Sequence, residues 1–166
     1  MVNRISYVLI AVVILGVSLS YNALPDPLYT HTSLMQLIEK NVQLQWGREN
    51  FLLFYMALFV ITNLFIYLLL PMLVSKYPKG LIWINRSYWF KDEDRQRQLI
   101  TAAKSVIAYA GLYANFIFLF TYWFVYLTNI GIADYFHIIF IIAITAGTVW
   151  FLYYTFSTLK PGTETR

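Results

Sequence analysis

The two histidines of the chain, His31 and His137, each follow an aspartate at short spacing. Asp134 and His137 are three residues apart, so a helical start to the last apolar segment places them on one face. Together with Asp26 and His31 they form a set of carboxylates and imidazoles that suits a zinc or copper ion, or a pH-sensing cluster. The alternative, which we favour, is four separate solvated residues, because ligands from distant loops have no diagnostic spacing. We predict no bound cofactor.

Two asparagines are the main strongly polar residues in the middle of the apolar segments. Asn63 and Asn115 lie at similar predicted depth, so we expect them to hydrogen-bond across a helix bundle, where an unpaired amide is costly. The alternative is a polar gate on a transport path. Ionisable residues normally mark such paths, and the apolar segments contain no Asp, Glu, Lys or Arg. An ion-coupled pump is therefore disfavoured.

The composition indicates a membrane protein. Hydrophobic residues make up 60% of the 166 residues and charged residues 12%, about half the charged share of a soluble domain. Cysteine is absent, which excludes disulfides and cysteine nucleophiles. The net charge of +4 is dispersed, so a nucleic-acid binder is excluded. With no catalytic constellation in the sequence, we predict a protein that is not an enzyme and whose partners are membrane lipids and other membrane proteins.

Four segments are long enough to cross a membrane as helices. A helix needs roughly 20 apolar residues to span hydrocarbon about 30 Å thick. The segments that meet this requirement are residues 5–23, 51–74, 105–127 and 135–156. We predict an all-α fold, a four-transmembrane-helix bundle that forms one integral membrane domain over residues 1–166. An outer loop, 24–50, and a cytoplasmic loop, 75–101, connect the first three spans.

The outer loop has a pattern typical of a short amphipathic helix. Residues 33–36 fit a capping box, apolar residues then recur at helical spacing, and Gly47 is a suitable stop after Trp46. We predict a helix over 33–46 that lies either flat on the outer membrane surface or over the end of the bundle. Residues 24–27 should be extended, because each of their two prolines disfavours helix in the residue before it.

The basic residues predict the orientation. Only Lys40 and Arg48 fall in the outer loop, whereas the other ten of the twelve Lys and Arg lie on the opposite side. These ten are Arg4, Lys76, Lys79, Arg86, Lys91, Arg95, Arg97, Lys104, Lys160 and Arg166. By the positive-inside rule both termini are cytoplasmic, in a bacterial inner membrane or an equivalent one.

Acidic residues open the third span. Asp92, Glu93 and Asp94 suit a helix N-terminus, and the pairs Asp92–Arg95 and Glu93–Arg97 have supporting helical spacings. A helix from Glu93 to Leu127 would be about 50 Å long, so its first turns should project from the membrane. In the second span, Pro71 is expected to kink or end the helix.

An aromatic stripe runs along the third span at helical spacing. Such stripes invite a pigment or quinone interpretation, but packing against a helix or lipid is the commoner cause, and we predict that. The stripe comprises Tyr109, Tyr113, Phe116, Phe120 and Phe124. Small residues should allow the third and fourth helices to approach closely: Ala108, Gly111, Ala143, Ala146 and Gly147.

The segment 85–91, Asn-Arg-Ser-Tyr-Trp-Phe-Lys, followed by Arg95, resembles a cytoplasmic motif of a bacterial family of unknown function that is related to SdpI-type toxin-immunity membrane proteins. The outer segment 24–27 with His31 is similar to that family's proline and histidine loop. Two departures are Ile84, where the family has proline, and the predicted outer helix in place of a glycine-rich turn. The resemblance implies a multispanning, non-enzymatic protein whose relatives include immunity and signalling proteins.

The same segment predicts the contact residues Asn85, Arg86, Tyr88, Trp89 and Arg95. Tyr88 and Trp89 suit either an aromatic belt at the headgroups or a protein-docking role, and the basic residues suit anionic lipid or a cytoplasmic partner. We predict a protein that acts through contacts with other proteins in the bilayer, as an SdpI-like immunity or signalling protein or a small accessory subunit. The alternatives are a transporter or channel component and an outer metal-binding protein.

Overall fold

The computed structural model describes residues 2–30, 44–81, 85–130 and 136–160, and four long helical segments account for most of them. All four are long and apolar enough to cross a membrane. They are α1 (Val2–Ser20), the second span, α7 (Glu93–Asn129) and α8 (Phe136–Thr158). The prediction of an all-α, four-span fold is confirmed, and the chain is a multi-pass membrane protein.

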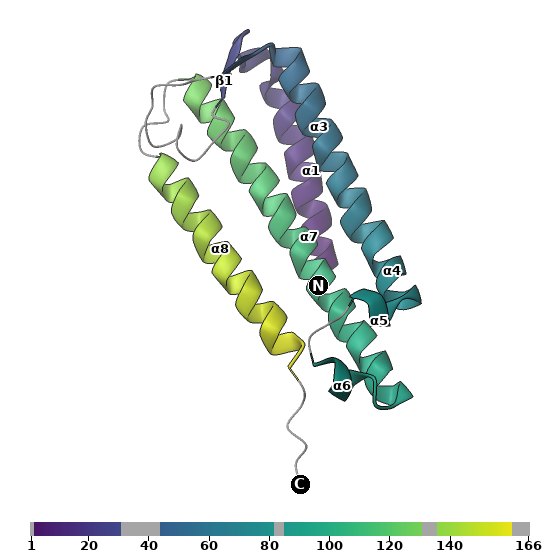
Figure 1. Cartoon of the computed structure of the whole chain (residues 1–166). Helices are drawn as coiled ribbons and strands as arrows, with labels where there is room; N and C mark the ends of the chain where they lie inside the picture. The colour runs from purple at the N-terminus through teal and green to yellow at the C-terminus, as the bar shows by residue number, and fades with distance from the viewer. Residues whose placement is uncertain (1, 31–43, 82–84, 131–135, 161–166) are drawn as a thin grey trace.

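The long helix α7 is the centre of the arrangement (Figure 1). Helix α1 and the second span pack along one side of α7, and α8 lies along the other. Helix α1 begins and α8 ends at the same end of the molecule. We call this the basic end, because it carries Arg4, Lys76, Lys79, Arg86, Lys91, Arg95, Arg97, Lys104 and Lys160. The opposite end is the sheet end.

The second span is a continuous helix with a wider turn inside it. It consists of α3 (Arg48–Leu64), the π-helical turn η2 (Phe65–Leu69) and α4 (Leu70–Lys76). Pro71, which cannot donate a backbone hydrogen bond, lies in the first turn of α4, just beyond this π turn. The helix therefore continues past the proline and ends at Lys76. The short helices α5 (Pro78–Leu81) and α6 (Arg86–Trp89) then lead to α7.

Helix α7 is one unbroken helix of 37 residues, about 55 Å long at 1.5 Å per residue. Its N-cap is Asp92, whose Oδ1 accepts a hydrogen bond from the backbone N–H of Arg95 at 2.8 Å. Arg95 Nε lies 3.2 Å from Asp92 Oδ2, and Arg97 Nη2 lies 3.9 Å from Glu93 Oε2. Both predicted pairs are confirmed, and the helix exceeds the thickness of a bilayer core.

A small antiparallel sheet forms the sheet end. After the 3-10 turn η1 (Tyr21–Ala23), strand β1 (Leu28–Thr30) pairs with β2 (Leu44–Trp46). The predicted helix over 33–46 is therefore wrong for its last three residues, because their backbone groups bond to β1. The rest of that predicted helix lies outside the described residues.

The end of α7 is joined to this sheet by one side chain. The amide of Asn129 accepts a hydrogen bond from Tyr29 N and donates one to Tyr29 O, both at 2.9 Å. It thus binds to β1 as a neighbouring strand would. The loop after the first span is held on the central helix.

Two separate clusters of buried side chains make up the core. The first lies between α1, α3 and α7 and includes Val13, Phe59 and Tyr122. The second lies at the basic end and includes Trp89 and Leu159. Helix α8 contributes little, since no residue in its most apolar window is buried. The first three spans therefore share a core, and α8 is attached to its outside.

Candidate functional site

The interior of the first three spans contains polar groups at several depths. On the second span, Tyr55, Phe59, Asn63 and Tyr67 recur every four residues and therefore share one helix face. That face is directed at α7, where Phe59 and Tyr55 are buried. Three of the four residues on this face carry a polar group into the bundle.

The two predicted asparagines meet in the middle of this face. Asn63 Nδ2 donates a hydrogen bond to Asn115 Oδ1 at 2.9 Å, and a second to the carbonyl of Phe59 at 2.9 Å. Asn115 is fully buried, at 0% exposure, and its Nδ2 lies 3.5 Å from the hydroxyl of Tyr67. The predicted hydrogen bond between the spans is confirmed.

Tyr67 extends this network toward the basic end. It lies within the π turn η2, and its ring packs against Gly111 of α7, where a Cβ atom would collide with the ring and the hydroxyl. On the side of α1, the Tyr7 ring lies 6.2 Å from the Tyr67 ring, and the neighbouring Ser6 is fully buried and donates to the carbonyl of Val2 at 3.2 Å. Tyr67 therefore lies between α7 and α1.

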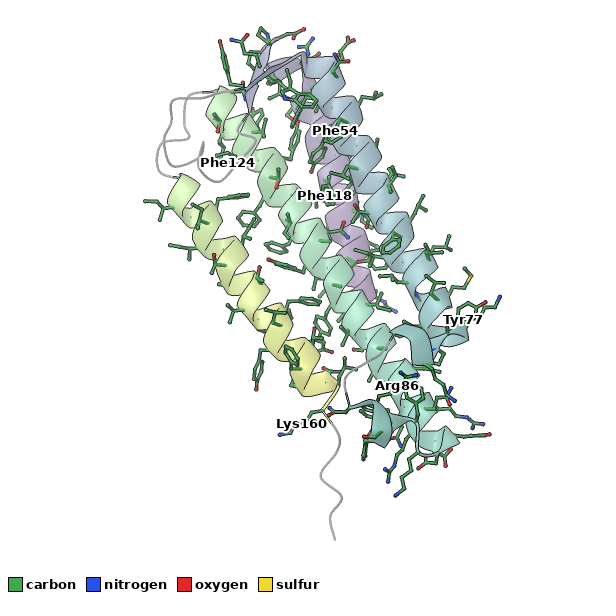
Figure 2. All side chains as sticks on the ribbon, viewed as in Figure 1. Phe54, Tyr77, Arg86, Phe118, Phe124 and Lys160 are labelled. Carbon is green, nitrogen blue, oxygen red and sulfur yellow. The ribbon has the colours of Figure 1, made fainter. Side chains whose placement is uncertain are left out.

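A second polar group lies nearer the sheet end. Tyr122 and Ser20 are hydrogen-bonded through their hydroxyls, and the Tyr55 hydroxyl donates to the carbonyl of Phe118 at 2.7 Å. The rings of Phe59 and Phe118, 5.2 Å apart and edge to face, lie between this group and the asparagine pair. Figure 2 shows Phe118 in the half of the bundle nearer the sheet end. We call these two groups of polar side chains together the polar column; its members are Ser20, Tyr55, Asn63, Tyr67, Asn115 and Tyr122. The Phe59–Phe118 ring pair separates its two parts.

The polar side chains named above are tyrosine and serine hydroxyls and asparagine amides. They bond to one another or to backbone carbonyls. In the part of the chain that the structure describes, no group of three or more His, Asp or Glu is placed to hold a metal ion. What the arrangement does physically is to join α1, the second span and α7 by interhelical hydrogen bonds.

Replacement of Asn115 by leucine is expected to lower the free energy of unfolding by about 1–2 kcal/mol, because the Asn63 amide loses its interhelical partner. The double variant Asn63→Leu/Asn115→Leu should recover part of the loss, since it leaves no unpaired amide. Unfolding of the purified protein by SDS, followed by circular dichroism, measures both. An Asn115→Leu protein as stable as the parent would contradict a stabilising hydrogen bond between Asn63 and Asn115.

The predicted aromatic stripe packs mainly against α8. The Tyr109 ring lies 4.1 Å from that of Tyr154, and the Tyr113 ring stacks on Phe151 at 5.9 Å. Phe124 stacks on Phe140 at 5.2 Å nearer the sheet end. These contacts confirm helix packing as the cause of the stripe for these members. We refer to this contact as the α7–α8 seam.

Of the two glycines predicted to lie between α7 and α8, one does and the other does not. Gly147 of α8 does lie on the seam, where a Cβ would be 2.6 Å from Cε2 of Tyr113. Gly111 faces Tyr67 of the second span instead, so its prediction as a contact with the fourth helix is wrong. The reason is that Gly111 and Tyr113 point to different sides of α7.

Two hollows remain along the α7–α8 seam. Their volumes are about 320 and 280 Å³, and nearly all their surface is apolar. Phe120 lines both, Trp123 lines the one nearer the sheet end, and Trp150 lines the other. Helix α8 therefore contacts α7 through large rings that leave space between them.

Residues 85–91, the segment that resembles the family motif, bind the end of α8 at the basic end. We call this contact the clamp. Asn85 Nδ2 and Trp89 Nε1 both donate to the carbonyl of Leu159, each at 3.2 Å. This carbonyl follows the last turn of α8, where backbone acceptors lack helical partners. Trp89 is 5% exposed, so its prediction as an interfacial or docking residue is wrong. The clamp attaches the end of α8 to the loop before α7.

The remaining residues of that segment surround the clamp. Arg95 lies 4.4 Å above the ring of Tyr88, and Tyr88 packs edge to face on Trp89. Arg86 is exposed and lies at the same end of the molecule as Lys160 (Figure 2). A lipid or partner role for Arg86, Tyr88 and Arg95 stays a prediction.

The predicted outer metal site is described only at Asp26. Its Oδ1 accepts a hydrogen bond from the backbone N–H of Arg48 at 3.1 Å, which satisfies a donor in the first turn of α3. His31, Asp134 and the side chain of His137 lie outside the described residues. The one described member of the set is thus used in helix capping.

Sequence reasoning missed Ser6, Tyr55, Tyr67 and Tyr122, and it gave Gly111 the wrong partner helix. The available signal was the spacing of four between Tyr55, Phe59, Asn63 and Tyr67, which places both tyrosines on the face of a predicted polar residue. Gly111 is one helical turn from Asn115, where a small residue leaves room for a ring.

Comparison with family models, curated proteins and solved structures finds no match for this chain. The fold and the buried polar column define its class, which is that of helical multi-pass membrane proteins.

Proposed function

We propose that this protein acts by binding another membrane-embedded protein through the exposed face of α8. The observation that carries the proposal is Thr145, which lies in the middle of α8, is exposed, and has no side-chain hydrogen bond among the described residues. By contrast, Thr148 and Thr155 each donate to a carbonyl one turn earlier, at 2.8 and 2.9 Å. A free hydroxyl at this depth is poorly accommodated by lipid and well accommodated by a polar group of a neighbouring helix.

The surroundings of Thr145 support a helical partner. Ala146 beside it is also exposed, and bulky Ile142 and Val149 flank the two small residues on the same face. A small notch between large apolar side chains lets a second helix approach closely. Helix α8 is apolar on all sides, as is typical of a helix surrounded by protein or lipid.

Two segments of the sequence support a more specific role. The segment 85–91 and the 24–27 loop resemble a bacterial family related to SdpI-type immunity proteins, so the proposed role is immunity, signalling or that of an accessory subunit, without an enzymatic activity. The excess of Lys and Arg at the basic end supports a bacterial inner membrane with both termini cytoplasmic.

Transport has weaker support as a function. The polar groups of the first three spans bond to one another, and the Phe59–Phe118 ring pair separates the two polar levels. The column contains no ionisable Asp, Glu, Lys or Arg, the residues that normally mark an ion path. The polar column therefore supports helix association more directly than conduction.

Site-specific photo-crosslinking in the native membrane tests the proposal. A photoreactive residue at Ile142, Thr145 or Val149 is expected to yield a discrete adduct with another membrane protein. The matched controls are Ile61 and Leu68, which are exposed on the second span. Adducts confined to lipid at the α8 positions, or equal protein adducts at the control positions, would count against a partner on α8.

A further inference from the structure

A groove between the first and second spans at the sheet end has two chemically distinct halves. Its volume is about 540 Å³, within the range of small-molecule sites, about 300–1,000 Å³. One half is polar and contains Ser18, Tyr21, Asn22 and Glu49, and the other is apolar and contains Val17, Leu52, Leu53 and Met56.

The polarity changes along the axis of the spans. Glu49 and Asn22 lie where α3 begins and just after α1 ends. Met56 is seven residues further along α3 than Glu49, about 10 Å deeper at 1.5 Å per residue. The groove thus passes from a span end, where headgroups lie, into the hydrocarbon region.

The polar half carries the carboxylate of Glu49, which forms no ion pair with a Lys or Arg of the described residues. The Glu49 side chain is exposed, and its Oε1 lies 3.4 Å from the hydroxyl of Tyr21. The neighbouring Arg48 binds other groups: its guanidinium lies 4.6 Å above the ring of Tyr21, and Nη1 donates to Leu24 O at 3.1 Å.

We propose that this groove binds a phospholipid with a primary ammonium headgroup, its acyl chain against Leu52, Leu53 and Met56. An ammonium carries three N–H donors, which match the Glu49 carboxylate, the Tyr21 hydroxyl and the Asn22 side-chain oxygen. A choline headgroup has no N–H donor, and a glycerol headgroup has no positive charge. The groove therefore selects ethanolamine phospholipid by charge and by hydrogen bonding.

Lipid retention by the full chain tests this inference. The protein is extracted from nanodiscs with equal mole fractions of phosphatidylethanolamine, phosphatidylcholine and phosphatidylglycerol, and retained lipid is measured by native mass spectrometry. Phosphatidylethanolamine is expected to dominate. Glu49→Gln should lower its ratio to phosphatidylcholine about fivefold, equivalent to about 1 kcal/mol at 1.4 kcal/mol per factor of ten.

Two further variants make the result decisive. Asp94→Asn removes a carboxylate at the basic end and should leave the ratio unchanged. Leu53→Trp fills the apolar half while keeping the charge, and should lower retention of all three lipids. Equal retention of the three lipids by the parent, or a preference that survives Glu49→Gln, would overturn the inference. Because Glu49 also suits the first turn of α3, the thermal-unfolding midpoint of each variant is measured in parallel.

Discussion

Trp89→Ala is expected to lower the free energy of unfolding by about 3–5 kcal/mol, the range for truncation of a buried tryptophan. The indole is 5% exposed in the core of the basic end, and its Nε1 donates to Leu159 O at 3.2 Å. Truncation removes the ring and one of the two donors that hold the end of α8. Helix α8 should therefore become more accessible than α1 or α3.

The measurement combines SDS unfolding with hydrogen exchange, which reports protection of each helix. Trp89→Phe retains most of the ring and removes only the donor, so its loss of stability should be clearly smaller. Asn85→Gly tests the other donor, because Asn85 has φ 52°, a left-handed conformation that glycine adopts readily. A Trp89→Ala protein with parental stability and parental protection of α8 would refute the clamp.

Gly111→Ala is expected to destabilise the protein by about 1–3 kcal/mol, or more, as other overpacked sites do. The added methyl would occupy the position of the Tyr67 ring end, which must then leave its place beside Asn115. In a Tyr67→Ala background the same change should be neutral or stabilising, because the space is empty and alanine favours helix. The unfolding free energies of the four proteins form a double-mutant cycle.

Gly16→Ala is the matched control for that cycle. Gly16 also lies inside a membrane-spanning helix, but a Cβ at this position would meet nothing within 4 Å. The substitution should leave stability unchanged or raise it by up to about 1 kcal/mol. Equal effects at Gly111 and Gly16 would show that the Tyr67 contact does not limit the space at Gly111.

Local patterns in the sequence were sufficient for some features of the fold. The start of α7 was predictable, because Asp92 and Glu93 interact with residues three and four positions away. The Asn63–Asn115 bond was also predictable, since few polar partners exist at that depth. Trp89 was not, because an aromatic residue near a span end suits the headgroup region and a buried clamp equally well.

The sequence by itself determined that this is a four-span membrane protein, because the length of apolar runs and the positions of charges are properties of single segments. It also determined which polar groups had to find partners in the hydrocarbon region. Only the tertiary structure decided that α7 is central, that Tyr67 packs on Gly111 and that Trp89 holds the end of α8. These contacts join residues 44 and 70 positions apart. They depend on which helix faces pack together. The sequence alone does not show this pairing, because the apolar faces are similar and only the fit of their side chains distinguishes one pairing from another.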